Sequence, residues 1–237
     1  MIISRLSGGL GNQLFQYAAG RALSLARSVP LALDLSLLQS RNEGVTPRTY
    51  GLGAYNIAAG IADPADVARL CQPTFLGSTL LGRIAQKLSP IESRSCYYEK
   101  SHAFDETFTR LGSDVYLAGH WQSEKYFRSV ADTIRDDVTL KSAFSPDAER
   151  LAAEIGSART PVSVHVRRGD YVTNPHAARY HGMPGVDYFE KALSEISGVE
   201  PDAHFFVFSD DPSWVRDNLT FGQRLTVVEP GRDAEDL

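Results

Sequence analysis

A short segment of alternating valines that ends in charge constrains the fold of this chain more than any other. Residues 162–166 alternate valine with serine or histidine, and Arg167, Arg168, Gly169 and Asp170 follow directly. Side chains along a β-strand point to opposite faces in turn, so this period of two predicts a strand with one apolar and one polar face. The strand delivers charged groups at its carboxyl end.

His165 and Arg167 share the polar face of this strand because they are two residues apart. In an open α/β sheet, ligands bind beyond the carboxyl ends of the strands, and adjacent arginines there predict an anion site. A phosphorylated ligand is the first expectation. The alternative is that Arg167, Arg168 and Asp170 form an ion-pair cluster on the surface.

A second strand-to-helix junction follows the predicted strand 203–208, which runs into Ser209, Asp210 and Asp211. Crossover connections between parallel strands are right-handed, and the carboxyl ends of such strands share one edge of the sheet. Asp210 is therefore expected on the same edge as Arg167. Asp211 precedes a proline and reads as a helix N-cap, whereas Ser209 and Asp210 are expected to contact a ribose, a base or the arginines.

The start of the chain predicts a strand over residues 2–6, a glycine-rich loop over 7–11 and a helix over 12–27, with Asn12 as its N-cap. Glycines let backbone N–H groups approach a ligand, so the loop is a candidate for binding a phosphate or sugar hydroxyls. It lacks the third glycine of a dinucleotide fingerprint and the Gly-Lys-Ser/Thr of a P-loop. The alternative is a tight turn without a ligand.

Residues 119–127 are dense in polar and aromatic side chains after the predicted strand 115–118. Aromatic faces stack on the C–H surfaces of sugars, and Gln, His and Glu bind hydroxyls, so Trp121, Gln122 and Glu124 are candidates for a sugar site. The alternative is that the aromatic rings belong to the core.

The rest of the pattern alternates strands with helices and so predicts the α/β class. We expect further strands at 30–35, 96–98 and 225–228, and helices at 64–70, 78–88, 124–136, 146–155 and 187–196. Two domains follow, 1–145 and 160–237, with residues 141–160 as the hinge.

Composition excludes several classes of function. A net charge of −5 argues against general nucleic-acid binding, which leaves a basic footprint. No segment approaches the ~20 apolar residues of a membrane span, although this leaves room for peripheral contact with a membrane. Cys71 and Cys96 form no CxxC pair and read as free thiols. We expect a cytoplasmic protein.

Four segments together resemble those of glycosyltransferase family 11, the α-1,2-fucosyltransferases. They are residues 8–17 (GGLGNQLFQY), 165–171 (HVRRGDY), 206–211 (FVFSDD) and 119–127 (GHWQSEKYF), the last with His120 where the family usually has Tyr. The resemblance runs over nearly the whole chain, and the combination is specific where each segment alone is not.

This resemblance implies two Rossmann-like halves of the GT-B-like kind, with an acceptor side at 1–145 and a GDP-fucose-binding half at 160–237. It also implies inverting transfer of L-fucose from GDP-fucose to the 2-hydroxyl of a terminal β-galactoside, at the membrane face where glycans are assembled. No metal and no further cofactor are expected, because arginine charge can neutralise a leaving diphosphate.

Site roles are expected as follows. The catalytic residues are Arg167, Asn12 and Asp170. The donor-binding residues are Gly9, Gly11, His165, Arg167, Arg168, Ser209 and Asp210. The acceptor-binding residues are Trp121, Gln122 and Glu124. The catalytic base stays open among Asp170, His176, His181 and Glu124.

Three further expectations bear on function. The family pattern continues beyond the Asp-Leu at which this chain stops, so the second half is expected to be incomplete. One alternative is a catalytically silent carbohydrate- or nucleotide-binding module. Another is an NAD-type dehydrogenase using residues 9–11 and Asp34, which leaves Arg167 and Asp210 without a role.

Overall fold

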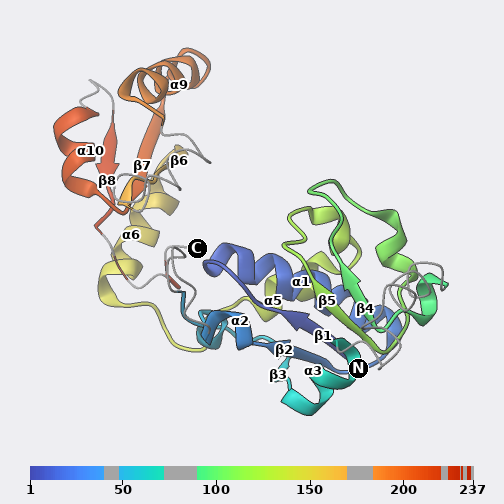
Figure 1. The fold of residues 1–237 in the computed structure, drawn as a ribbon. Coiled ribbons are helices and arrows are strands. Elements are labelled where there is room, and N and C mark those ends of the chain that lie inside the picture. The colour runs from blue at the N-terminus through green and yellow to red at the C-terminus, as the bar shows by residue number, and fades with distance from the viewer. Residues whose placement is uncertain are drawn as a thin grey trace. The chain divides into compact units, whose positions relative to one another are not determined.

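The computed structural model describes residues 1–39, 48–71, 90–169, 184–219, 224–229, 231 and 234–235. The chain divides into two compact units, Met1–Ser142 and Ala143–Leu237, and each has its own sheet (Figure 1). The expected hinge contains helix α6 (Pro146–Ser157), which begins behind an N-cap at Ser145 and belongs to the second unit.

The first unit is built on a parallel sheet in which β1 is central. Its described strands, in spatial order, are β3 (Gly60–Ile61), β2 (Leu31–Asp34), β1 (Ile2–Arg5), β5 (Val115–Ala118) and β4 (Cys96–Tyr98). Strands buried on both faces read as apolar runs, as the Val-Tyr-Leu-Ala of β5 and the two isoleucines that open β1 do. Because β1 and β5 are neighbours in this sheet, the polar loops that follow them start from adjacent strands.

Helix α1 (Leu10–Arg27) covers one face of this sheet, as Figure 1 shows. It packs with Leu33 and Leu117 in the main core, together with α5 (Ala131–Asp137). The approach is close at Gly20, where a Cβ would lie 2.9 Å from a methyl carbon of Leu31. A small residue is needed there to seat the helix.

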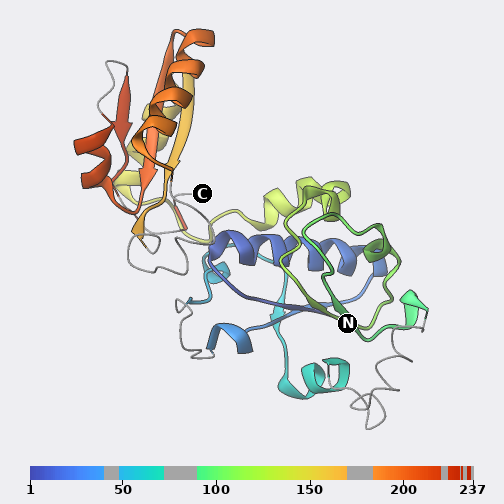
Figure 2. The same ribbon diagram turned by 45° about the horizontal axis from the view of Figure 1, so that its top comes forward.

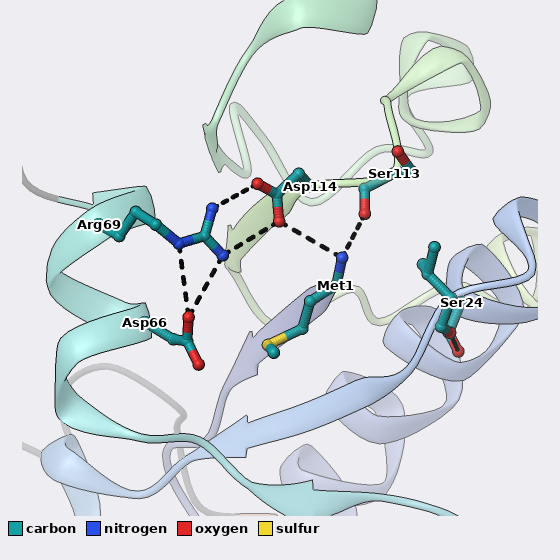
Figure 3. A network of polar contacts seen from close by, with 7 residues as sticks. Met1, Ser24, Asp66, Arg69, Ser113 and Asp114 are labelled. Carbon is teal, nitrogen blue, oxygen red and sulfur yellow. Dashed lines mark hydrogen bonds and ion pairs between the residues drawn. The ribbon is translucent and has the colours of Figure 1, made fainter.

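Helix α3 (Pro64–Cys71) packs on the opposite face, through Leu70 against a second apolar cluster. On the outer side of α3, Arg69 binds Asp66 of the same helix and Asp114, which precedes β5 (Figure 3). The amino group of Met1 donates to the carbonyl of Ser113 at 2.6 Å and to the same Asp114 at 3.3 Å. This exposed network fastens the amino end of the sheet.

The second unit has a parallel sheet with a helical layer on one face. Its described strands, in order, are β6 (Thr160–Val166), β7 (Ala203–Ser209) and β8 (Leu225–Val227). Helices α9 (Val186–Val199) and α10 (Pro212–Asn218) pack on the valine face of β6 and on Val207 (Figure 2). On β6 the valines are at least partly buried while Ser163 and His165 are exposed.

The predicted α/β class with two parallel sheets is confirmed. Two of the expected helices differ from those in the structure. Helix α1 begins at Leu10 with Gly9 at its N-cap, so Asn12 lies inside the first turn and is not the cap. The helix expected over 124–136 is broken into two 3₁₀ turns before α5, because the backbone leaves the helical region at Phe127 and Val130. The short helix α2 (Ser36–Gln39) and β3 were not predicted. The helix expected at 78–88 lies outside the described residues.

Asp34 has a structural role in this fold. It is 5% exposed and accepts hydrogen bonds from the hydroxyl of Tyr116 at 2.7 Å and the amide of Ser36 at 2.9 Å. Burial, and then the bond to Asp34, raises the pKa of Tyr116. Both carboxylate oxygens of Asp34 thus already accept hydrogen bonds within the protein, which argues against the ribose contact of a dehydrogenase.

We predict that Asp34→Ala lowers the free energy of unfolding by about 2 kcal/mol, because a buried hydroxyl and an amide lose their acceptor. Urea denaturation measures the change. Tyr116→Phe, which removes only one hydrogen bond, should cost about 1 kcal/mol. An unchanged unfolding midpoint for Asp34→Ala would contradict the structural role.

Candidate functional site

The carboxyl edge of the second sheet is organised by Asp210, the first residue after β7. Its Oδ1 accepts the backbone N–H of Arg168 at 2.7 Å, and its Oδ2 accepts that of Gly169 at 3.0 Å. A Cβ on Gly169 would lie 2.9 Å from the same Oδ2, so glycine is needed for this approach. Asp210 thus closes the turn that carries the arginines.

Ser209 and Asp211 complete the junction. The Ser209 hydroxyl donates to the carbonyl of Val166 at 2.8 Å and accepts the amide of Asp211 at 3.0 Å. Asp211 caps α10 by accepting the amide of Trp214 at 3.1 Å, as the sequence predicts. This bond, followed by Ser213 and Arg168, outweighs burial and lowers the pKa of Asp211.

Arg168 is held within the unit. Its Nε lies 3.3 Å from Oδ2 of Asp211, and its guanidinium carbon stacks 3.9 Å above the ring centre of Trp214. The side chain is only 17% exposed. A stacked and paired guanidinium is a rigid element of the site. Its charge still adds to the potential at this edge.

Arg167 and His165 present the exposed side of the same edge. The alternation of β6 carries through to Arg167, which is exposed while Val166 is 1% exposed. The sequence thus correctly predicts which of the two arginines shares the face of His165. Asp170, the third expected catalytic residue, lies outside the described residues, as do His176 and His181.

In the first unit, two buried glutamines hold the loop that follows β1. Gln13 Nε2 donates to the carbonyls of Gly8 at 3.1 Å and Thr49 at 2.9 Å. Gln16 accepts the amide of Ser7 and donates to its hydroxyl, both at 2.9 Å. Sequence reasoning missed these residues, although two amides on the inner side of an apolar helix could have indicated them.

Of the three glycines after β1, Gly9 at the N-cap and Gly11 in the first turn of α1 are open, and Gly8 is tightly packed. Gly8 has a φ of 73°, and a Cβ there would lie 2.3 Å from Nδ2 of Asn12. A Cβ on Gly9 or on Gly11 would have no atom of its surroundings within 4 Å. Packing within the described residues therefore does not require glycine at either position, which is compatible with close approach of a ligand.

Gln122 and Asn12 are brought together at the carboxyl edge of the first sheet. Nε2 of Gln122, which follows β5, donates to Oδ1 of Asn12 at 2.7 Å. Gln122 is exposed. Because Asn12 is not consumed as a helix cap, its side chain is available for this bond. Two residues predicted separately thus meet in one polar group.

Trp121 is a core residue, and the expectation that it stacks on an acceptor sugar is wrong. Its side chain has no exposed surface and packs among Tyr97, Phe108 and Tyr126. Its backbone has a φ of 55°, in the left-handed region, which turns the indole inward. Glu124 is exposed and paired with Arg128, and its acceptor contact stays a prediction.

We predict that Trp121→Ala lowers the free energy of unfolding by about 3–5 kcal/mol, the usual cost of emptying a buried tryptophan site. Chemical denaturation measures it. Gln122→Ala, one residue away on the surface, is the control and should change stability by no more than about 0.5 kcal/mol. Equal stability of the two variants would contradict the core assignment.

The described residues contain no group of three or more His, Cys, Asp or Glu side chains arranged to hold a metal ion. Within the same ranges, no helix has both the length and the apolar character that a membrane crossing requires.

Comparison with known proteins identifies relatives along most of the chain. O-antigen biosynthesis glycosyltransferase WbnK of Escherichia coli is 29% identical, over 95% of this chain and 78% of that protein. An alpha-1,2-colitosyltransferase of Escherichia coli is 30% identical, over 91% of this chain and 71% of that protein. A galactoside 2-alpha-L-fucosyltransferase of Caenorhabditis elegans is 26% identical, over 89% and 52%.

Among solved structures, the NodZ alpha-1,6-fucosyltransferase soaked with GDP-fucose covers 99% of this chain and 78% of its own, at 19% identity and a TM-score of 0.49. That likeness is too loose to add to the fold described above. The sequence profile of glycosyl transferase family 11 matches residues 88–236, which include the carboxyl ends of β6 and β7. The chain belongs to glycosyl transferase family 11.

Proposed function

We propose that the protein transfers L-fucose from GDP-fucose to the 2-hydroxyl of a terminal β-galactoside, with inversion at the transferred carbon. The family match over residues 88–236 carries this proposal, since it spans the arginine turn and the acidic junction beside it. The Caenorhabditis elegans relative is named a galactoside 2-alpha-L-fucosyltransferase, which agrees with the linkage proposed here. The alpha-1,2 linkage recurs in the name of the colitosyltransferase.

The donor half of the proposal rests on residues 160–237. When the bond from fucose to the diphosphate breaks, negative charge grows on the leaving oxygen, and a fixed guanidinium stabilises it without reorganisation. Arg167 and His165 are the exposed groups at the strand end and take this role. Arg168, Ser209 and Asp210 support them, because their polar groups are already bonded within the edge.

The acceptor half of the proposal rests on residues 1–145. Asn12 and Gln122 form the polar pair at the edge of this sheet, with Gly9 and Gly11 open beside Asn12. Amide groups of this kind bind sugar hydroxyls as both donors and acceptors. An inverting transfer also needs a base for the attacking hydroxyl, and of the four candidates we propose Asp170, the carboxylate that follows the arginines in the sequence.

One observation introduces a second candidate donor sugar, colitose. One of the most similar relatives is an alpha-1,2-colitosyltransferase, and colitose differs from fucose by the missing 3-hydroxyl. A site that binds the 3-hydroxyl through buried polar groups rejects the deoxy sugar strongly, whereas an apolar site discriminates far less. The donor sugar is therefore the part of the proposal that most needs a direct comparison. The name of the WbnK relative, an O-antigen biosynthesis glycosyltransferase, supports a role in glycan assembly.

We predict transfer from GDP-fucose to lactose, measured as GDP release that depends on the acceptor, with GDP-colitose as the competing donor. EDTA should leave the rate unchanged, because arginine charge replaces a bridging cation. Binding of GDP without acceptor-dependent release from either donor would favour the silent binding module. Loss of activity in EDTA that Mg²⁺ or Mn²⁺ restores would contradict the arginine account.

We predict that Arg167→Lys lowers kcat by about 10²–10³, since the amine keeps the charge but loses the two-pronged donor geometry aimed at the leaving group. Arg168→Lys is the matched control. It should lose the stacking on Trp214 and show a lower melting temperature, with a smaller effect on kcat. A larger fall in kcat for Arg168→Lys than for Arg167→Lys would reverse the assignment.

A further inference from the structure

Glu99, the residue directly after β4, binds the backbone of the segment that carries Gln122. Its Oε2 accepts the amide N–H of His120 at 2.7 Å, and its Oε1 accepts that of Trp121 at 3.1 Å. Its own amide donates to the carbonyl of Ala118 at 2.9 Å. One carboxylate thus spans the end of β4 and the end of β5.

These bonds act where the backbone is held in an uncommon conformation. Trp121 has a φ of 55°, a region that bulky side chains rarely occupy. The turn before it leaves no space, because a Cβ on Gly119 would lie 2.5 Å from Cβ of Glu99 and 2.9 Å from the indole of Trp121. The conformation persists because the surrounding contacts over-determine it.

The left-handed residue sends consecutive side chains in opposite directions. Trp121 turns into the core, while Gln122 stays exposed and reaches Asn12. The carbonyl of Trp121 also accepts the amide of Ser123 at 2.7 Å, which tightens the turn on the far side of Gln122. The place of Gln122 therefore depends on how the amides of residues 120 and 121 are held.

We propose that Glu99 is a positioning residue for the acceptor, and that it acts through Gln122 by fixing the backbone of residues 120–121. The proposal rests on the proposed function in one respect only, the role of the pair of Gln122 and Asn12 in binding the galactoside. Glu99 itself touches no substrate. It decides whether the amide of Gln122 is presented to a sugar hydroxyl at the correct place.

The test uses Glu99→Gln, which keeps the size of the side chain but replaces one acceptor oxygen by an NH₂ donor that faces a backbone donor. We expect kcat/KM for lactose to fall about 10- to 100-fold, as small misplacements of binding groups do. The affinity for GDP, measured by calorimetry, should not change. Glu92→Gln, which removes only an exposed ion pair with Arg110, is the control and should behave as wild type.

A double-mutant cycle separates positioning from a general loss of structure. If Glu99 acts through Gln122, then Glu99→Gln adds no further loss of kcat/KM to Gln122→Ala. Losses that multiply, or an unaffected Gln122→Ala, would overturn the proposal. A fall in GDP affinity with Glu99→Gln would overturn it too.

Hydrogen exchange gives a readout that does not depend on activity. The amides of His120 and Trp121 should exchange slowly in the wild-type chain and faster in Glu99→Gln, with the amides of β1 unchanged. Unchanged exchange at both residues would overturn the proposal. If the wild-type chain transfers no sugar to any β-galactoside, the proposed function fails, and the exchange experiment alone decides whether Glu99 holds this backbone.

Discussion

The carboxylate of Asp210 makes the contact on which the candidate donor site depends. It accepts two backbone N–H groups, those of Arg168 and Gly169, at the point where β6 ends and no further strand pairing satisfies them. Charge-assisted bonds of this kind are short and strong. They fix the direction in which the chain leaves the sheet, and with it the side on which Arg167 emerges.

The same device recurs at the edge of the first sheet. Gln16 binds the amide of Ser7, and Glu99 binds the amides that follow β5. Each loop would otherwise present unsatisfied N–H groups where its strand stops. Side chains that bind backbone therefore set the geometry of both edges, and we propose that Gln122, Asn12 and Arg167 contact the substrate.

Strand ends and faces were predictable because they depend on local pattern. The valine alternation before Arg167 and the acidic cap before Pro212 need only the neighbouring residues to be read correctly. The family assignment was predictable as well, since it rests on the residues themselves. The strand faces, the helix cap and the family motifs can all be read from the sequence without knowledge of tertiary contacts.

Local pattern failed where tertiary contacts decided the outcome and where a helix begins without a side-chain cap. Trp121 follows a strand as a sugar-stacking residue would, yet rings from residues 97, 108 and 126 enclose it. The sequence leaves open whether Asp210 contacts a ribose, a base or the arginines, and its oxygens accept backbone N–H groups 41 and 42 residues earlier, that of Arg168 among them. The start of α1 was misplaced because Gly9 caps it without a side-chain bond, and so leaves no signal.

We propose that these two sheets serve fucosyl transfer to the 2-hydroxyl of a β-galactoside. The most direct measurement is the linkage of the product, determined by NMR after incubation of the protein with GDP-fucose and lactose. We expect a through-bond correlation from the anomeric proton of an α-linked fucose to carbon 2 of galactose. A fucose attached at any other galactose carbon, or joined with retained configuration, would contradict it.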